Sequence, residues 1–291
     1  MEFIAALING LSAGGTYAII ALGYTMVYGI AKMLNFAHGD IIMVGGYAMY
    51  VTLLLAGHPI VALAAAIVLC VILGITVERF AYKPLRGASP LAVLITAIGV
   101  SFLLQSLAQI VFGSSPKILG AVKIDGFWSI GALKIDYSTL VTLAVTVVVM
   151  TVLTVFVKYA KIGRAMVAVS EDRDAALLMG INTNAIMAIT FAIGSALAAV
   201  ACYLMLTKGS GVTSTLGAMP GIKAFTAAVI GGIGSIPGAM LGGILLGVVE
   251  SISLSIPAIA PFTDAVSFAI LIVILLVKPA GLLGKMRREK V

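Results

Sequence analysis

The sequence predicts an all-α fold, a polytopic bundle of transmembrane helices that forms one domain over residues 1–291. Hydrophobic residues make up 62% of the chain and charged residues 10%, and the mean hydropathy is +1.20. A soluble domain is about 45–50% apolar and about 25% charged, because polar groups must cover its surface. The composition therefore excludes a soluble enzyme, a disordered chain and a nucleic-acid-binding domain.

Charge-free apolar runs define the expected helices, since a membrane-spanning helix needs about 20 mostly apolar residues. The windows are 3–31, 41–57, 60–79, 91–112, 137–157, 185–207, 222–253 and 263–278. In the first window, Gly10 and Gly14 form a GxxxG face for close helix packing. Gly57-His58-Pro59 separates the second window from the third. Window 222–253 is longer than one helix, and Gly234-Ser235-Ile236-Pro237-Gly238 divides it into two shorter helices or a re-entrant pair.

Lysine and arginine predict the orientation, because cytoplasmic loops carry an excess of both. Thirteen of the 18 Lys and Arg residues lie in the linkers 31–40, 78–90 and 158–174 and in the tail 278–291. We expect these segments in the cytoplasm and the N-terminus on the outer side. An N-terminus on the outer side and a C-terminus in the cytoplasm require an odd number of crossings. Nine crossings, with segment 222–253 crossing twice, are therefore favoured over eight. The net charge of +7 then reflects topology and contact with anionic lipid rather than nucleic acid.

Few ionisable residues fall inside the windows, although pumps and proton-coupled transporters usually carry them there. Glu250 is the strongest candidate, and its alternative is an interfacial position at a helix end. His38 and Asp40 have two interpretations: a hydrogen-bonding gate, or an interfacial histidine beside an acidic helix cap, which the cytoplasmic side favours. The sequence has no metal-ligand cluster, nucleophile motif or P-loop. We therefore expect no catalytic residue and no bound metal, which leaves a channel or a permease energised by another protein.

The polar segment 158–184 is longer than a connector needs and predicts a short cytoplasmic helix. Ser170 is the expected N-cap, and acidic residues at 171, 172 and 174 fill the first turn, where the helix dipole favours them. Gly180 is the expected stop. Such a helix can dock into a groove of a partner protein or lie on lipid. The acidic start disfavours lipid, because the inner leaflet is negative.

Two motifs resemble those of known membrane transporters. Asp174-Ala175-Ala176-x-x-x-Gly180 resembles the Glu-Ala-Ala-x-x-x-Gly motif of ABC importer permeases, with Asp in place of Glu and without the Ile-x-Leu-Pro that follows the glycine. The run Asn35-Phe36-Ala37-His38-Gly39-Asp40 resembles the LivH-type permeases of branched-chain amino acid ABC transporters. Gly163-Arg164-Ala165-Met166 and the glycine-rich stretch 231–247 resemble the same family, so the resemblance covers essentially the whole chain.

The resemblance implies a permease subunit of a bacterial inner-membrane importer for leucine, isoleucine and valine. Its implied partners are a homologous LivM-type permease, two ATP-binding cassette subunits that hold ATP-Mg, and a periplasmic binding protein. No cofactor is expected on this chain. Related permeases for urea, amides or other amino acids, and a stand-alone secondary transporter or channel, remain as alternatives.

The resemblance and the pattern together select candidate site residues. Those expected to couple to the ATPase are Glu171, Arg173, Asp174, Ala175, Ala176 and Gly180. Those expected along the translocation pathway are Asn35, His38, Asp40, Gly231, Gly234, Gly238 and Glu250. Interrupted helices at membrane depth are tolerated where they line a cavity or are covered by protein, which is why the glycines near 231–238 belong to this set.

Overall fold

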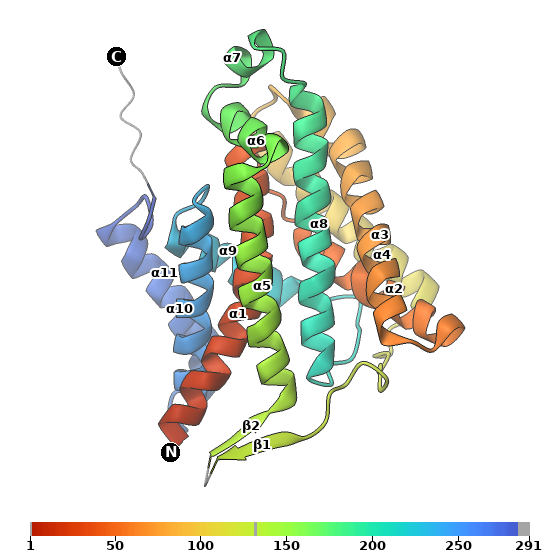
Figure 1. Cartoon of the computed structure of the whole chain (residues 1–291), viewed down its shortest axis with the longest axis vertical. Coiled ribbons are helices and arrows are strands. Elements are labelled where there is room, and N and C mark those ends of the chain that lie inside the picture. Colours follow the sequence, from red (N-terminus) through yellow and green to blue (C-terminus); the bar gives the residue numbers. More distant parts are fainter. Residues whose placement is uncertain (1, 131–132, 285–291) are drawn as a thin grey trace.

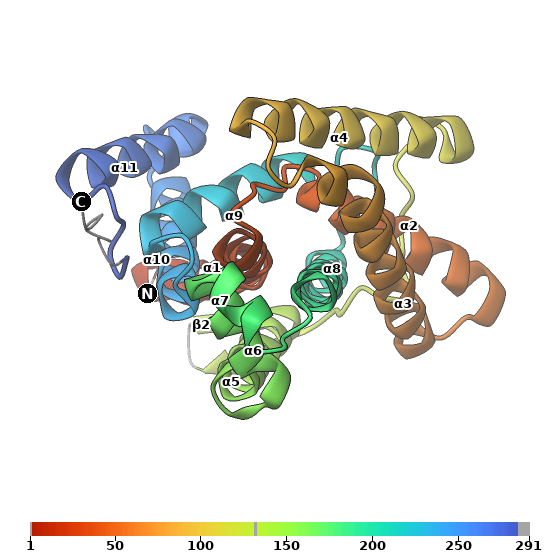
Figure 2. The same ribbon diagram turned by 90° about the horizontal axis from the view of Figure 1, so that it is seen from above.

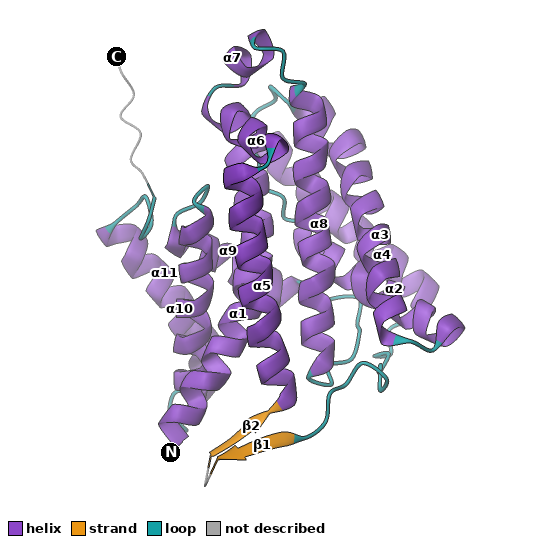
Figure 3. Ribbon diagram, in the orientation of Figure 1, coloured by secondary structure: helices purple, strands orange, loops and turns teal. Residues whose placement is uncertain are grey.

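A computed structural model describes residues 2–130 and 133–284 as a helical bundle with one small hairpin (Figures 1 and 3). The helices are α1 (Glu2–Ala31), α2 (His38–Ala56), α3 (Pro59–Val77), α4 (Pro90–Phe112), α5 (Tyr137–Tyr159), α6 (Lys161–Glu171), α7 (Arg173–Leu178), α8 (Thr183–Thr207), α9 (Ala218–Gly231), α10 (Ile236–Ser255) and α11 (Thr263–Val277). Strands β1 (Phe127–Ile130) and β2 (Leu133–Asp136) pair antiparallel. Short π and 3-10 segments occupy Glu78–Tyr82, Lys83–Leu85 and Ala260–Phe262. The predicted all-α polytopic fold is confirmed.

Every predicted window contains a helix, and eight of the described helices are long and apolar enough to cross a membrane. The break between α2 and α3 has the expected cause. Gly57 adopts a left-handed conformation with φ of 66° and ends α2, a conformation that glycine adopts without steric cost. Pro59 then opens α3, where its missing N–H costs nothing, and the His58 side chain accepts a bond from the Ile60 N–H.

The long seventh window is two helices, α9 and α10, as predicted. The carbonyl of Thr207, at the end of α8, accepts from the Ile124 N–H near the β1–β2 hairpin. The α9–α10 turn lies at the opposite end of the bundle, where Gly234 packs beside Gly29 near the end of α1. Segment 208–235 therefore traverses the bundle and α10 returns. Together with the eight longer helices, the described residues run along the bundle nine times, and nine membrane crossings stay a prediction.

Glycine allows α1 to approach α10 closely at the centre of the bundle. A Cβ on Gly10 would lie 2.7 Å from the Cα of Val248, and one on Gly14 would lie 2.7 Å from the Cα of Ile244. The predicted GxxxG face is thus the contact with α10, where small residues bring two backbones together. Figure 2 shows α1 surrounded by α5, α8, α9 and α10, so this pair anchors the core.

Helices α2 and α9 begin inside the bundle rather than at its ends. After α1, the segment 32–37 turns back, so α2 starts beside Gly194, near the middle of α8. The first turns of α2 and α9 meet there: the backbone of Gly39 packs directly against Gly217 and Gly221. Only residues without a Cβ permit this approach. The windows did not predict this re-entry, because a run of apolar residues carries no information about its depth.

Candidate functional site

His38 lies inside the bundle, with 1% of its surface exposed. Its ring occupies the space left by the missing side chain of Gly23 and stacks edge to face on Tyr24, with ring centroids 4.7 Å apart. The prediction of an interfacial histidine is therefore wrong. The physical reason is the return of segment 32–37 into the bundle, which carries the start of α2 away from the membrane surface.

Asp40 is equally buried, with 3% of its surface exposed. The predicted role as the N-cap is wrong, because the N-cap of α2 is Ala37 and Asp40 lies inside the first turn of the helix. Instead, Gln105 Nε2 of α4 donates to Asp40 Oδ1 at 2.8 Å and to Ser101 Oγ at 3.2 Å. Asp40 thus connects α2 to α4 by a hydrogen bond to a buried carboxylate.

A cavity of about 230 Å³ lies next to Asp40, between the starts of α2 and α9 and the side of α4. Its lining includes Tyr24, Phe36, Asp40, Ser101, Gln105 and Gly217. We call it the central cavity. Asn35 is also buried but belongs elsewhere: its Oδ1 accepts from the Tyr82 hydroxyl at 2.9 Å, which fixes the re-entrant segment to the end of α3. The structure therefore buries all three residues but gives each a different neighbour: His38 packs on Tyr24, Asp40 bonds to Gln105 and Asn35 bonds to Tyr82.

Glu250 takes part in a buried ion pair that the sequence did not predict. Lys223 Nζ of α9 lies 2.6 Å from Glu250 Oε1 of α10 and 2.7 Å from Asp264 Oδ1 of α11. The side chains of Lys223 and Glu250 are 10% and 13% exposed, whereas that of Asp264 is 54% exposed. The sequence pattern predicted no role for Lys223; its position inside the alanine- and glycine-rich run 218–231 is the signal that could have found it.

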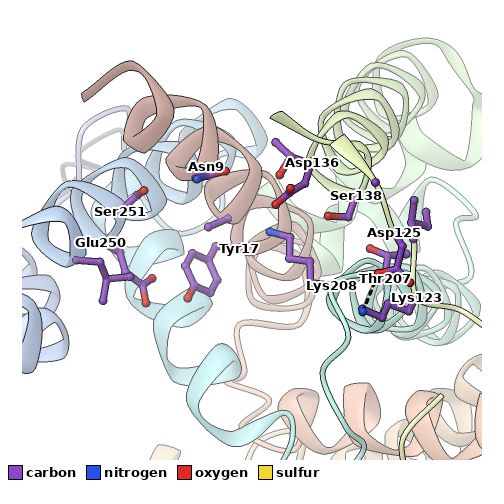
Figure 4. Close-up of a pocket in the computed structure, with 15 residues that line it drawn as sticks. Asn9, Tyr17, Lys123, Asp125, Asp136, Ser138, Thr207, Lys208, Glu250 and Ser251 are labelled. Atoms are coloured by element: carbon purple, nitrogen blue, oxygen red, sulfur yellow. Dashed lines mark ion pairs between the residues drawn. The ribbon is translucent and has the colours of Figure 1, made fainter. Parts of the chain in front are cut away.

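A second, larger cavity of about 480 Å³ lies at the hairpin end of the bundle (Figure 4). We call it the hairpin-end cavity. Its polar lining includes Asn9, Tyr17, Lys123, Asp125, Asp136, Ser138, Thr207, Lys208, Glu250 and Ser251. Figure 4 shows Tyr17 beside Glu250, and Lys208 on the side towards Asp136. Burial lowers the pKa of Lys208, and the nearby Asp136 carboxylate opposes that shift. Both signs of charge therefore meet in one open cavity.

At the opposite end, α7 is the short helix predicted in segment 158–184. The predicted cap is wrong: Ser170 lies in α6 and donates to the Val167 carbonyl, while the Asp172 side chain accepts from the N–H groups of residues 174 and 175 and caps α7. Gly180 follows the helix with φ of 81°, as a glycine stop requires. Leu178 and Met179 are 88% and 82% exposed, so α7 presents an apolar tip.

The remaining coupling candidates surround this tip. Glu171, Arg173, Asp174 and Ala175 are exposed, whereas Ala176 is buried against the bundle. A groove of about 830 Å³ separates this segment from the loop after α3, and Glu171 and Arg173 line it with Arg86.

Arg86 holds together the two segments on either side of this groove. It bonds to Glu78 at the end of α3 and to Asn184 at the start of α8. The side chains of Arg86 and Glu78 are both buried. The number of Lys and Arg residues in the linkers predicted neither the contact with Glu78 nor the contact with Asn184.

The glycines of the α9–α10 turn have close backbone contacts. Gly231 and Gly238 face each other, and a Cβ on either would overlap the carbonyl of the other. Gly234 has φ of 93° and borders a small cavity beside α6. These contacts give the three glycines a packing function, and their place along a translocation pathway stays a prediction.

Known proteins resemble the chain over nearly its whole length. Residues 6–275 match the family described as the permease component of the branched-chain amino acid transport system. The chain belongs to this family. The resemblance predicted from Asn35–Asp40 and the glycine-rich stretch is thereby confirmed.

Individual relatives agree with the family. The permease is 43% identical over 303 residues to the high-affinity branched-chain amino acid transport system permease protein BraD of Pseudomonas aeruginosa, covering 100% of this chain and 98% of the relative. It is 43% identical over 305 residues to LivH of Escherichia coli, with the same coverage. A probable LivH of Methanocaldococcus jannaschii is 29% identical over 91% of this chain and 88% of its own length. The permease is thus a multi-pass membrane protein of a transport system and not itself an enzyme.

Proposed function

We propose that this permease is the membrane-spanning subunit of a bacterial ABC importer for leucine, isoleucine and valine. The observation that carries the proposal is the 43% identity to BraD and LivH along the entire chain, because both relatives are named for branched-chain amino acid transport. The composition supports it, since a pathway for an apolar zwitterion needs few fixed charges. Specificity is then left to a soluble binding protein that delivers the amino acid.

The proposed assembly contains a homologous LivM-type permease, two ATP-binding cassette subunits and a periplasmic binding protein. The ATPases hold ATP-Mg and supply the energy. Segment 158–184 is the proposed coupling loop, with Glu171, Arg173, Asp174, Ala175, Ala176 and Gly180 at the ATPase contact. The exposed apolar tip of α7 supports this role, because exposed leucine and methionine favour burial in a protein groove.

The proposed orientation in the inner membrane places the hairpin end in the periplasm and α6–α7 in the cytoplasm. Arg79, Arg86, Arg164 and Arg173 support it, because they belong to the segments at the α6–α7 end. Arg287 and Arg288, which contributed to the predicted charge asymmetry, lie outside the described residues. In this orientation the hairpin-end cavity with Glu250 is the outer mouth of the permease.

Reconstitution tests this function. Liposomes that hold the permease with its partner permease and ATPases should accumulate leucine when ATP is inside and leucine-loaded binding protein is outside. Omitting the binding protein or either partner should abolish uptake. Urea or acetamide uptake in place of leucine would assign the permease to one of the alternative substrates. Uptake by this chain alone along an ion gradient would make it a secondary transporter and would contradict the proposal.

A further inference from the structure

Asp40 is a buried carboxyl group that has no basic partner among the residues that the structure describes. Its Oδ1 accepts a hydrogen bond from Gln105, but no Lys, Arg or His nitrogen lies within 4.0 Å of its carboxylate in the described part of the chain. The other buried carboxylates, those of Glu78 and Glu250, each pair with a basic side chain. An unpaired charge at this depth is costly and marks a functional position when it borders a cavity.

The central cavity next to Asp40 is large enough for a small organic molecule. Its volume of about 230 Å³ greatly exceeds the roughly 30 Å³ that one water molecule occupies in the liquid. Two of its walls differ in chemistry. The polar wall consists of Asp40, Ser101 and Gln105, and the apolar wall consists of Phe36, Ile98 and Ile222.

The start of α9 forms the third wall, with Gly217, Ala218 and Gly221. The N-terminal end of a helix carries a partial positive charge that favours anions. Here α9 begins at Ala218, so this end of its dipole lies at the cavity. A negative group is thus favoured at α9, a positive group at Asp40 and an aliphatic group at the apolar wall. An α-amino acid with an aliphatic side chain combines these three groups in one molecule.

We propose that the central cavity holds the transported amino acid during its passage, with its α-ammonium group on Asp40 and its carboxylate towards the start of α9. Gln105 and Ser101 are positioning residues, because their hydrogen bonds fix the Asp40 carboxylate against α4. This inference rests on the proposed function, which supplies the amino acid as cargo. It assigns to Asp40 a direct contact with cargo rather than a structural role at a helix start.

The test compares three variants in the reconstituted importer at saturating leucine-loaded binding protein. Asp40→Asn, which keeps the shape and removes the charge, should lower the maximal rate of leucine uptake at least about tenfold, since a charge-assisted hydrogen bond is lost. Asp40→Glu should restore most of the rate. Asp125→Asn is the comparison variant in the hairpin-end cavity, and it should lower the rate less than Asp40→Asn does. Copurification with the ATPases and basal ATP hydrolysis show that each variant assembles.

Leucine analogues identify the group that Asp40 contacts. Isoamylamine keeps the ammonium group and side chain of leucine, and 4-methylpentanoate keeps the carboxylate and side chain. The amine should slow uptake by the wild type more than the acid does, at concentrations that leave leucine on the binding protein. Inhibition by the amine that is as strong in Asp40→Asn as in the wild type would overturn the assignment of the ammonium group to Asp40.

The outcomes separate this inference from the proposed function. Wild-type uptake of leucine with normal uptake by Asp40→Asn would overturn the inference and leave the function intact. If Asp125→Asn loses uptake while Asp40→Asn keeps it, the cargo site belongs to the hairpin-end cavity. If the assembled wild type transports no leucine at all, the proposed substrate is wrong, and the cavity proposal fails with its cargo.

Discussion

Lys223 connects three helices through one ammonium group. It reaches Glu250 at 2.6 Å and Asp264 at 2.7 Å, so α9, α10 and α11 share a single cation near the hairpin end. A charge buried in this way is tolerated because its partners satisfy it. Helix α9 has 14 residues, and we infer that this ion pair adds to the packing that holds it against α10 and α11.

Replacing Lys223 with methionine should destabilise the protein strongly. The substitution leaves the buried carboxylate of Glu250 without a cation, and removing one partner of a buried pair costs about 3–5 kcal/mol of unfolding free energy. The thermal unfolding temperature in detergent measures the loss. Lys123→Met is the matched control, because Lys123 pairs with Asp125 on the surface, where a pair contributes at most about 1 kcal/mol. Equal unfolding temperatures for the two variants would show that the Lys223 ion pair does not stabilise the fold.

At the scale of the helices, the sequence predicts the elements well and their depths poorly. The break at Gly57 and the stop at Gly180 follow from backbone conformations that glycine alone adopts freely, so they can be read from the chain. The burial of His38 and Asp40 cannot be read in this way. It depends on the return of segment 32–37 into the bundle, a tertiary contact between glycines far apart in sequence.

The α1–α10 contact gives a prediction about packing. Gly247→Ala places a methyl group against the backbone of Gly14, where the two helices are closest, and overpacking of this kind costs about 1–3 kcal/mol. The unfolding temperature should fall. Gly99→Ala in α4 is the control, because a Cβ there meets no atom within 4 Å, and alanine is the better helix former. A Gly247→Ala protein as stable as the wild type would mean that α1 and α10 separate more easily than their contact implies.

The tip of α7 gives a prediction about coupling. Charge reversal at Glu171 and Asp174, combined with tryptophan at Gly180, should leave membrane insertion intact and prevent copurification of the ATPases. Glu171 ends α6 and Asp174 lies in the first turn of α7, and both are exposed. Gly180 has a left-handed φ that a bulky residue adopts only with strain. Asp125→Lys, at the hairpin end, should copurify normally. Recovery of wild-type amounts of ATPase with the triple variant would contradict the coupling role of segment 158–184.

For the whole molecule, charge and helix count lead to the same topology. The start of α1 and the end of α11 lie at opposite ends of the bundle (Figure 1). The arginines that the structure describes lie in segments at the α6–α7 end. Composition and charge therefore predict the architecture, because they reflect the solvent around each segment. They do not predict the central cavity, which three helices create only after they pack.

Cysteine labelling tests this topology directly. The chain has two cysteines, Cys70 and Cys202, and both are fully buried, so background reaction with a membrane-impermeant maleimide should be low. Ile118 precedes β1 and Leu178 ends α7, and the two side chains are 77% and 88% exposed. The β1–β2 hairpin and α7 lie at opposite ends of the bundle (Figure 1). In intact spheroplasts Ile118→Cys should react and Leu178→Cys should not, and inside-out vesicles should reverse the pattern. Reaction of both variants from one side would show that α5 does not cross the membrane, whereas a reversed pattern would invert the proposed orientation.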